Sequence, residues 1–177
     1  GVRIIYQPGQ QQSEFILGGI ESLKEAVARN RKNYTTKVVC FAELTVDETI
    51  RRRTTFPVGA QIYYIQRVRC IEGEALIIDH NYFLKDVVRD LTPEIAERSI
   101  YEYMENDLGE SIVTTKRKMT VERVNQIDET YLDLKDYNCM AVVSSMTYNK
   151  DGVMFEFTQS RHRPDRFVFY DLAHRTK

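Results

Sequence analysis

Two arginines, Arg67 and Arg69, lie two residues apart in an otherwise apolar stretch whose composition predicts a β-strand. Residues two apart on a strand point to the same face of a sheet, so the two guanidinium groups should lie side by side. Adjacent cations repel each other unless an anion lies between them, and the planar guanidinium group suits a carboxylate or a phosphate. The pair therefore indicates either an anion-binding site or a pair of surface or salt-bridged arginines.

Asp79 lies in the next predicted strand, which pairs with the arginine strand through a short hairpin. Its neighbours are apolar, and an ionised carboxylate is costly in such surroundings without a partner. One interpretation is an ion pair with Arg67 or Arg69. The other is a hydrogen-bond acceptor for sugar hydroxyls, and the two roles can alternate between an empty and a bound state.

Two serines stand where helices are expected to begin. Ser99 precedes Tyr101 at the start of one helix, and Ser22 starts another after a Gly18-Gly19 loop. Helix N-termini offer free amides and the positive end of the dipole, which suit a phosphate. An ordinary N-cap is the alternative role for both serines.

The segment 155–167 holds two further candidates, Glu156 and His162. A histidine between two arginines is typical of a solvated loop, and this reading stands beside the functional one. The run Arg51-Arg52-Arg53 predicts a solvated helix face rather than a nucleic-acid patch, because acidic residues lie close by and no aromatic residues interleave.

The sequence shows no pattern of a classical enzyme site. It has no Gly-x-Ser-x-Gly elbow, no glycine-rich nucleotide loop and no metal-ligand spacing among its three histidines and three cysteines. We therefore expect neither enzyme activity nor a metal or other cofactor. A recessed binding site fits the polar candidates better than a catalytic centre does.

Composition places the chain among ordinary globular proteins. The 177 residues carry a net charge of −1, so the chain as a whole has no strong attraction to nucleic acid or to an anionic membrane. No apolar run has the length of a membrane span, and no signal peptide is present. The three cysteines are odd in number and widely spaced, which suggests buried thiols in a reducing, cytoplasmic setting.

Strands dominate the expected secondary structure and are joined mostly by hairpins, which predicts an α+β domain with helices packed on an antiparallel sheet. Residues 1–12 read as an opening strand and a linker, and residues 13–177 as the domain. The expected strands are 2–6, 35–46, 62–71, 75–83, 111–123, 139–148, 153–159 and 166–172. The expected helices are 21–28, one after Asp47 through Arg53, a short one capped by Thr92 with Pro93 first, one that starts with 99–105 and stops near Gly109, and 128–134.

As a set, these residues resemble the effector-binding (UTRA) domain of GntR-type bacterial repressors of the HutC subfamily. That domain shares the fold of chorismate lyase. The likeness extends from about Gly18 to Arg175, and within the subfamily the chain most resembles the trehalose operon repressors of Gram-positive bacteria. The motifs that carry it are Arg67-Val68-Arg69, Gly73-Glu74, Asp79, Ser99-Ile100-Tyr101-Glu102 and the segment 156–167.

The resemblance implies a homodimeric transcriptional repressor whose N-terminal winged helix-turn-helix is missing here. Operator DNA would be bound only through that absent domain, and the partner of this domain would be a small-molecule effector. In relatives that sense sugar phosphates, one set of matching positions binds the phosphate and another faces the sugar. The phosphate set is Arg67, Arg69, Ser99, Tyr101 and Ser22, and the sugar set is Asp79, Glu156 and His162.

The chain departs from the wider subfamily at three positions. Asp79 stands where glutamate is frequent, His162 where amino-sugar-phosphate sensors tend to carry tyrosine, and Glu21 where a small hydroxyl residue is common. The aspartate and the histidine resemble the trehalose type, so trehalose 6-phosphate is the expected effector. Alternatives are N-acetylglucosamine 6-phosphate, a fatty acid and, from a different class, a chorismate lyase-like enzyme that would use the arginine pair for its anionic substrate.

Overall fold

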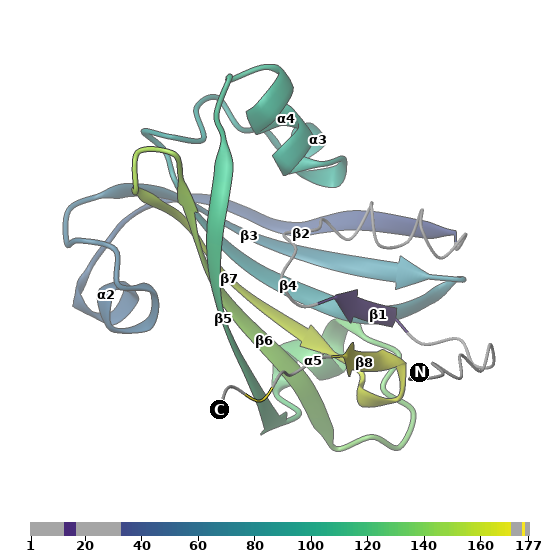
Figure 1. Ribbon diagram of the computed structural model, residues 1–177. Helices are drawn as coiled ribbons and strands as arrows, with labels where there is room; N and C mark the ends of the chain where they lie inside the picture. The colour runs from purple at the N-terminus through teal and green to yellow at the C-terminus, as the bar shows by residue number, and fades with distance from the viewer. Residues whose placement is uncertain (1–12, 17–32, 171–174, 176–177) are drawn as a thin grey trace.

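The computed structural model describes residues 13–16, 33–170 and 175 (Figure 1). The expected strand 2–6, the linker up to residue 12 and the helix 21–28 with Ser22 lie outside the described residues. The remaining expectations can be compared with the structure element by element.

A six-stranded antiparallel sheet forms the centre of the described chain, which confirms the α+β class. In spatial order its strands are β2 (Tyr34–Thr45), β3 (Gln61–Ile71), β4 (Glu74–Leu84), β7 (Met154–His162), β6 (Cys139–Asn149) and β5 (Ile112–Arg123). A second, two-stranded sheet pairs β1 (Ser13–Ile16) with β8 (Phe167–Tyr170) in parallel. Strand β1 was not expected from the sequence.

Short helices lie on both sides of the large sheet. Helices α3 (Pro93–Glu97) and α4 (Ile100–Asn106) lie on one side, and α2 (Glu48–Thr54) and α5 (Gln126–Tyr131) on the other (Figure 1). A 3-10 turn, η1 (Pro164–Arg166), joins β7 to β8.

The helix N-termini follow the capping rules on which the predictions rest. The side chains of Asp47, Thr92 and Ser99 accept hydrogen bonds from the first turns of α2, α3 and α4, as expected. The prediction for α5 was displaced, because Asn125 caps it through a capping box and the helix ends at Tyr131.

The β3–β4 hairpin fixes the pairing of the two central strands. Glu72 and Gly73 form its turn with φ values of 51° and 81°, and positive φ at both central residues matches the right-handed twist of the strands. The resulting register places Arg67 directly opposite Asp79. A β-bulge between Arg69 and Cys70 contributes to this register, because regular pairing from the turn would place Arg67 opposite Ile78.

The apolar core fills both sides of the sheet. Under α3 and α4 lies a cluster that includes Ile65, Phe83, Ile100 and Met104. The opposite face packs against α2 around Phe56 and against α5 around Leu132. On the α3–α4 side the apolar surface gives way along β3, β4 and β7 to buried polar residues.

Three further observations bear on the predictions from composition. Cys40, Cys70 and Cys139 are free thiols and half-buried, not fully buried as expected. No helix among the described residues is long and apolar enough to cross a membrane. The same residues contain no cluster of three or more His, Cys, Asp or Glu side chains that could hold a metal ion.

Candidate functional site

The candidate residues lie on one face of the three central strands. Asp79 on β4 is opposite Arg67 on β3 and Ser160 on β7, and residues directly opposite each other share a face. The same register places Thr158 opposite Asn81, Glu156 opposite Phe83 and His162 opposite Ile77. The pleat therefore gathers polar side chains from three strands, with α3 and α4 on the same side.

Asp79 lies between the two arginines. Arg69 Nε donates to Asp79 Oδ2 at 2.9 Å, and Arg67 Nη2 lies 3.9 Å from the same oxygen. The other carboxylate oxygen accepts a hydrogen bond from Ser160 Oγ at 2.6 Å. All three charged side chains are about 8% exposed, so the salt-bridge interpretation of the arginine pair is confirmed for the ligand-free chain.

Burial and the neighbouring charges shift the pKa values of Arg67 and Asp79. Burial, together with the neighbouring Arg69, lowers the pKa of Arg67 to about 9, against the attraction of Asp79 and Glu156. Arg67 thus stays protonated at neutral pH. Burial alone would raise the pKa of Asp79, but the two arginines and the Ser160 hydroxyl outweigh it and the pKa falls below its usual value. Asp79 is therefore ionised and acts as the internal counter-ion of the arginine pair.

Both guanidinium groups donate further hydrogen bonds within the protein. Arg67 Nε donates to Asn81 Oδ1 at 2.7 Å and Nη1 to the Ala96 carbonyl at 3.3 Å, which ties β3 to α3. Arg69 Nη1 donates to Thr36 Oγ1 at 2.9 Å. Within the described part of the chain, neither Nη2 group takes part in a hydrogen bond, so N–H donors of both arginines are left for an added anion.

Glu156 and Tyr101 form the second half of the group. Tyr101 donates from its hydroxyl to Glu156 Oε2 at 2.6 Å, and Thr158 Oγ1 donates to Glu156 Oε1 at 2.7 Å. Burial, followed by the negative charge of Glu156, raises the pKa of the Tyr101 phenol well above its usual value. The phenol therefore keeps its proton and remains a donor.

His162 is buried at the end of β7, so the interpretation as a solvated loop residue is wrong. The strand continues to residue 162, beyond the predicted end at 159, and the imidazole packs 5.2 Å from the Phe167 ring, centroid to centroid. Burial lowers the pKa of His162 to about 4, and Asp79 only partly offsets this. The imidazole is neutral at physiological pH and can donate to and accept from hydroxyl groups.

The arginines on either side of His162 serve the fold. Arg161 forms a bidentate pair with Asp128 at 2.8 and 2.9 Å, and Arg163 pairs with Asp165 and Glu74. Both are almost fully buried. By contrast, the run Arg51-Arg52-Arg53 on α2 is exposed to solvent, as predicted.

The two serines have different outcomes. Ser99 is buried and caps α4, because its Oγ accepts from the amide of Glu102 at 3.2 Å. Its contact with a phosphate stays a prediction. Ser22 lies outside the described residues, so the structure does not place it.

Sequence reasoning missed four polar residues of this group: Thr36, Asn81, Thr158 and Ser160. The available signal was the strand period. Asn81 lies two residues after Asp79, and Thr158 and Ser160 fill the positions between Glu156 and His162. Polar residues at every second position of a buried strand must line one face and satisfy one another.

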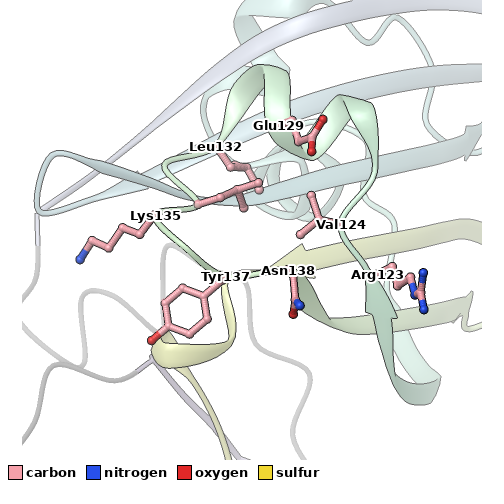
Figure 2. Close-up of a pocket in the computed structure, with 8 residues that line it drawn as sticks. Arg123, Val124, Glu129, Leu132, Lys135, Tyr137 and Asn138 are labelled. Atoms are coloured by element: carbon pink, nitrogen blue, oxygen red, sulfur yellow. The ribbon is translucent and has the colours of Figure 1, made fainter.

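A cavity of about 520 Å³ lies elsewhere, between the end of β5, helix α5 and the loop that leads to β6 (Figure 2). Its lining includes Arg123, Glu129, Lys135 and Tyr137 (Figure 2). No candidate residue placed by the structure lines this cavity.

Comparison with known proteins agrees with the geometry. The model of the UTRA domain family matches residues 29–168. The HTH-type transcriptional regulator TreR of Bacillus subtilis (strain 168) is 36% identical over 168 residues, which cover 95% of this chain and 71% of that protein. The HTH-type transcriptional regulator GmuR of the same organism is 28% identical over 156 residues, covering 88% of this chain and 63% of its own length.

A solved structure is also similar. The effector-binding domain of the B. subtilis trehalose repressor (TreR) aligns with a TM-score of 0.72 at 38% identity, and covers 81% of this chain and 99% of that chain. The similarity thus includes sequence, fold and nearly the whole of a solved effector-binding domain.

Proposed function

The chain belongs to the UTRA family of effector-binding domains of GntR-type transcriptional regulators, and on this basis we propose that its effector is a sugar phosphate, trehalose 6-phosphate. The family has the chorismate lyase-like fold but consists of regulator domains, so the chorismate lyase alternative is set aside. Binding of the effector would relieve repression of a sugar-utilisation operon.

The arginine pair around a single carboxylate is the observation that carries the proposal. Arg67 and Arg69 share one counter-ion, Asp79, and both retain unused Nη2 donors among the described contacts. A phosphate dianion offers more charge and more acceptor oxygens than one carboxylate, and charge-assisted bonds contribute roughly 1.5–3 kcal/mol each. The phosphate would take over the arginines and free Asp79 for sugar hydroxyls.

The sugar side is supported by a different chemistry. Glu156 offers acceptor oxygens, and the neutral imidazole of His162 offers one donor and one acceptor. The resemblance places Tyr101 in the phosphate set, but its protonated hydroxyl donates to Glu156, so we propose it for the sugar side instead. Groups that both donate and accept suit the hydroxyls of a neutral sugar. Ser99, at the N-terminus of α4, and Ser22 complete the proposed phosphate contacts.

The choice of trehalose 6-phosphate rests on the relatives. TreR of B. subtilis, a trehalose repressor by the description of its solved domain, is 36% identical over almost the whole of this chain. We further propose a cytoplasmic homodimer that contacts operator DNA through an N-terminal domain outside this sequence. The ligand acts as a switch only if it binds the DNA-free arrangement better than the DNA-bound one.

Isothermal titration calorimetry of this chain tests the proposal. Trehalose 6-phosphate should bind, whereas trehalose should not bind measurably because it lacks the anion. Glucosamine 6-phosphate is the control for the sugar. Binding of glucosamine 6-phosphate in place of trehalose 6-phosphate would keep the phosphate contacts and overturn the sugar assignment. If none of the three binds, the arginine pair is an internal salt bridge and the proposal fails.

A further inference from the structure

We propose that Asn81 and Thr158 are positioning residues that join the phosphate half of the site to the sugar half through a hydrogen-bond chain. This hydrogen-bond chain links five residues: Arg67, Asn81, Thr158, Glu156 and Tyr101. This inference rests on the proposed function, because it assigns the two ends of the chain to two parts of one ligand. Neither Asn81 nor Thr158 belongs to the predicted site.

Chemistry fixes the direction of every bond in the hydrogen-bond chain. Arg67 Nε can only donate, so the atom that faces it at 2.7 Å must be Asn81 Oδ1. The amide nitrogen Nδ2 then faces Thr158 Oγ1 at 2.7 Å and donates to it. The Thr158 hydroxyl is left to donate its own proton to Glu156 Oε1 at 2.7 Å.

Glu156 is the common acceptor where the hydrogen-bond chain ends. It receives Thr158 at one oxygen and Tyr101 at the other, at 2.7 and 2.6 Å. Each link determines the next, so Thr158 cannot turn its proton elsewhere without leaving Asn81 or Glu156 unsatisfied. The amide orientation set by Arg67 therefore decides which side of Glu156 is already occupied when a sugar arrives.

Burial prevents water from replacing a broken link. Asn81 is 1% exposed, and Thr158 and Glu156 are 8% and 5% exposed. A buried donor or acceptor that loses its partner keeps the full cost of desolvation, and polar networks in a low-dielectric interior strengthen link by link. A change in the hydrogen bond of Arg67 must therefore change the hydrogen bonds of Asn81 and Thr158 as well.

The sheet holds the hydrogen-bond chain in place. Asn81 and Thr158 are directly opposite each other on β4 and β7, and Glu156 lies two residues along β7 on the same face. These are central strands of the six-stranded sheet, where movement of one strand against the other would break the ladder. The links can rearrange at their side chains but not by strand displacement.

The substitution Thr158→Val tests the inference, because it interrupts the hydrogen-bond chain at its middle and keeps the shape of the side chain. By calorimetry we expect trehalose 6-phosphate to bind about tenfold more weakly. Thr158→Ser restores the hydroxyl and should bind within about twofold of the unsubstituted chain. Equal affinities for the unsubstituted chain and Thr158→Val would overturn the inference.

Thr54→Val is the matched control. Thr54 is also buried, and its hydroxyl donates to the Ile50 carbonyl at 2.8 Å within α2, on the other side of the sheet. Loss of this bond should lower the melting temperature as Thr158→Val does, but leave the affinity for trehalose 6-phosphate unchanged. Weaker binding by both variants would show a general effect of destabilisation and overturn the positioning role.

A second readout needs no ligand. Hydrogen exchange of the Arg67 Nε–H, followed by side-chain nitrogen NMR, should become faster in Thr158→Val because Asn81 loses the partner that orients its amide. The Arg69 Nε–H bonds Asp79 instead and should not change. An unchanged exchange rate at Arg67 overturns the hydrogen-bond chain even if sugar phosphates bind. If no sugar phosphate binds, the proposed function fails and this measurement alone decides the inference.

Discussion

At the scale of single residues, the site is closed by its own counter-ion. Asp79 carries the charge that the arginine pair needs, and its pKa is lowered by those arginines and by Ser160. If the effector phosphate binds here as proposed, it would replace the Asp79 carboxylate at the arginines, and the two cations would keep an anion between them throughout.

His162 makes the stability of the chain depend on pH. Its pKa is about 4 in the folded chain against an ordinary value of 6.5, so between these values the unfolded chain binds more protons. Stability should fall as the pH drops from 6.5 to 4, by about 3 kcal/mol from this residue alone. Urea unfolding of the chain and of His162→Gln, measured between pH 7 and about 4.5, checks this.

Comparing the unsubstituted chain with His162→Gln isolates the contribution of His162 to the pH dependence of stability. The pKa of His80 is also lowered, first by burial, but that residue is present in both proteins and its contribution cancels. The His162→Gln curve should be flatter in this pH window. Parallel curves for the two proteins would contradict the assignment of a buried, neutral imidazole.

How much of the site the sequence could predict depends on the range of each interaction. The shared face of the two arginines follows from the strand period, a local feature, whereas Asp79 reaches that face only through a β-bulge between Arg69 and Cys70, which the turn does not encode. The partnership of Tyr101 with Glu156 joins residues 55 apart in the chain, and no local pattern encodes it. The family resemblance supplied the two residues in separate sets and did not predict that they pair. Asn81 and Thr158 were missed because each looks like an ordinary polar strand residue until β4 and β7 are aligned.

At the scale of elements, a buried ion pair attaches α5 to the sheet. Arg161 on β7 is 2% exposed and binds both oxygens of Asp128, which is fully buried in the first turn of α5. Asp128→Asn should cost about 3–5 kcal/mol of unfolding free energy, because it leaves a buried guanidinium group without its main partner. Chemical denaturation of the variant measures this loss.

An exposed ion pair supplies the control for that experiment. Arg51 and Glu48 pair at 3.4 Å on α2 with side chains 58% and 65% exposed, so Glu48→Gln should change stability by no more than about 0.5 kcal/mol. A loss at Asp128 as small as the loss at Glu48 would show that α5 is not held by this pair.

Element boundaries show where local signals fail. The prediction ended β7 at residue 159 because an arginine and histidine segment reads as polar, whereas pairing with β4 and β6 carries the strand to His162. Helix α5 was placed late because Asp128 was taken as its start, although Asn125 caps it and Asp128 completes the capping box. Tertiary pairing decides the end of β7, whereas the start of α5 is decided by a local capping box that the prediction overlooked.

At the scale of the whole molecule, the arginine pair should govern induction. In a full-length repressor that carries this domain, Arg67→Ala should abolish release of operator DNA by trehalose 6-phosphate and leave operator affinity within about twofold. The reason is that Arg67, in the proposed function, contacts the effector, while its buried position in the sheet leaves it no direct contact with DNA. Electrophoretic mobility shift with and without the effector measures both quantities, and normal release by the variant would exclude the phosphate role of Arg67.

The parallel pairing of β1 with β8 has a consequence for the order of folding. Ser13 is aligned with Phe167, so nearly the whole described chain lies between the two partners. Closing so long a loop is entropically unfavourable until the intervening sheet has formed, whereas the β3–β4 hairpin closes locally. We expect β1 and β8 to join late in folding and to separate first when the native chain opens locally. Strand β1 is thus expected to detach and rejoin while the six-stranded sheet, and the polar face it carries, stays intact.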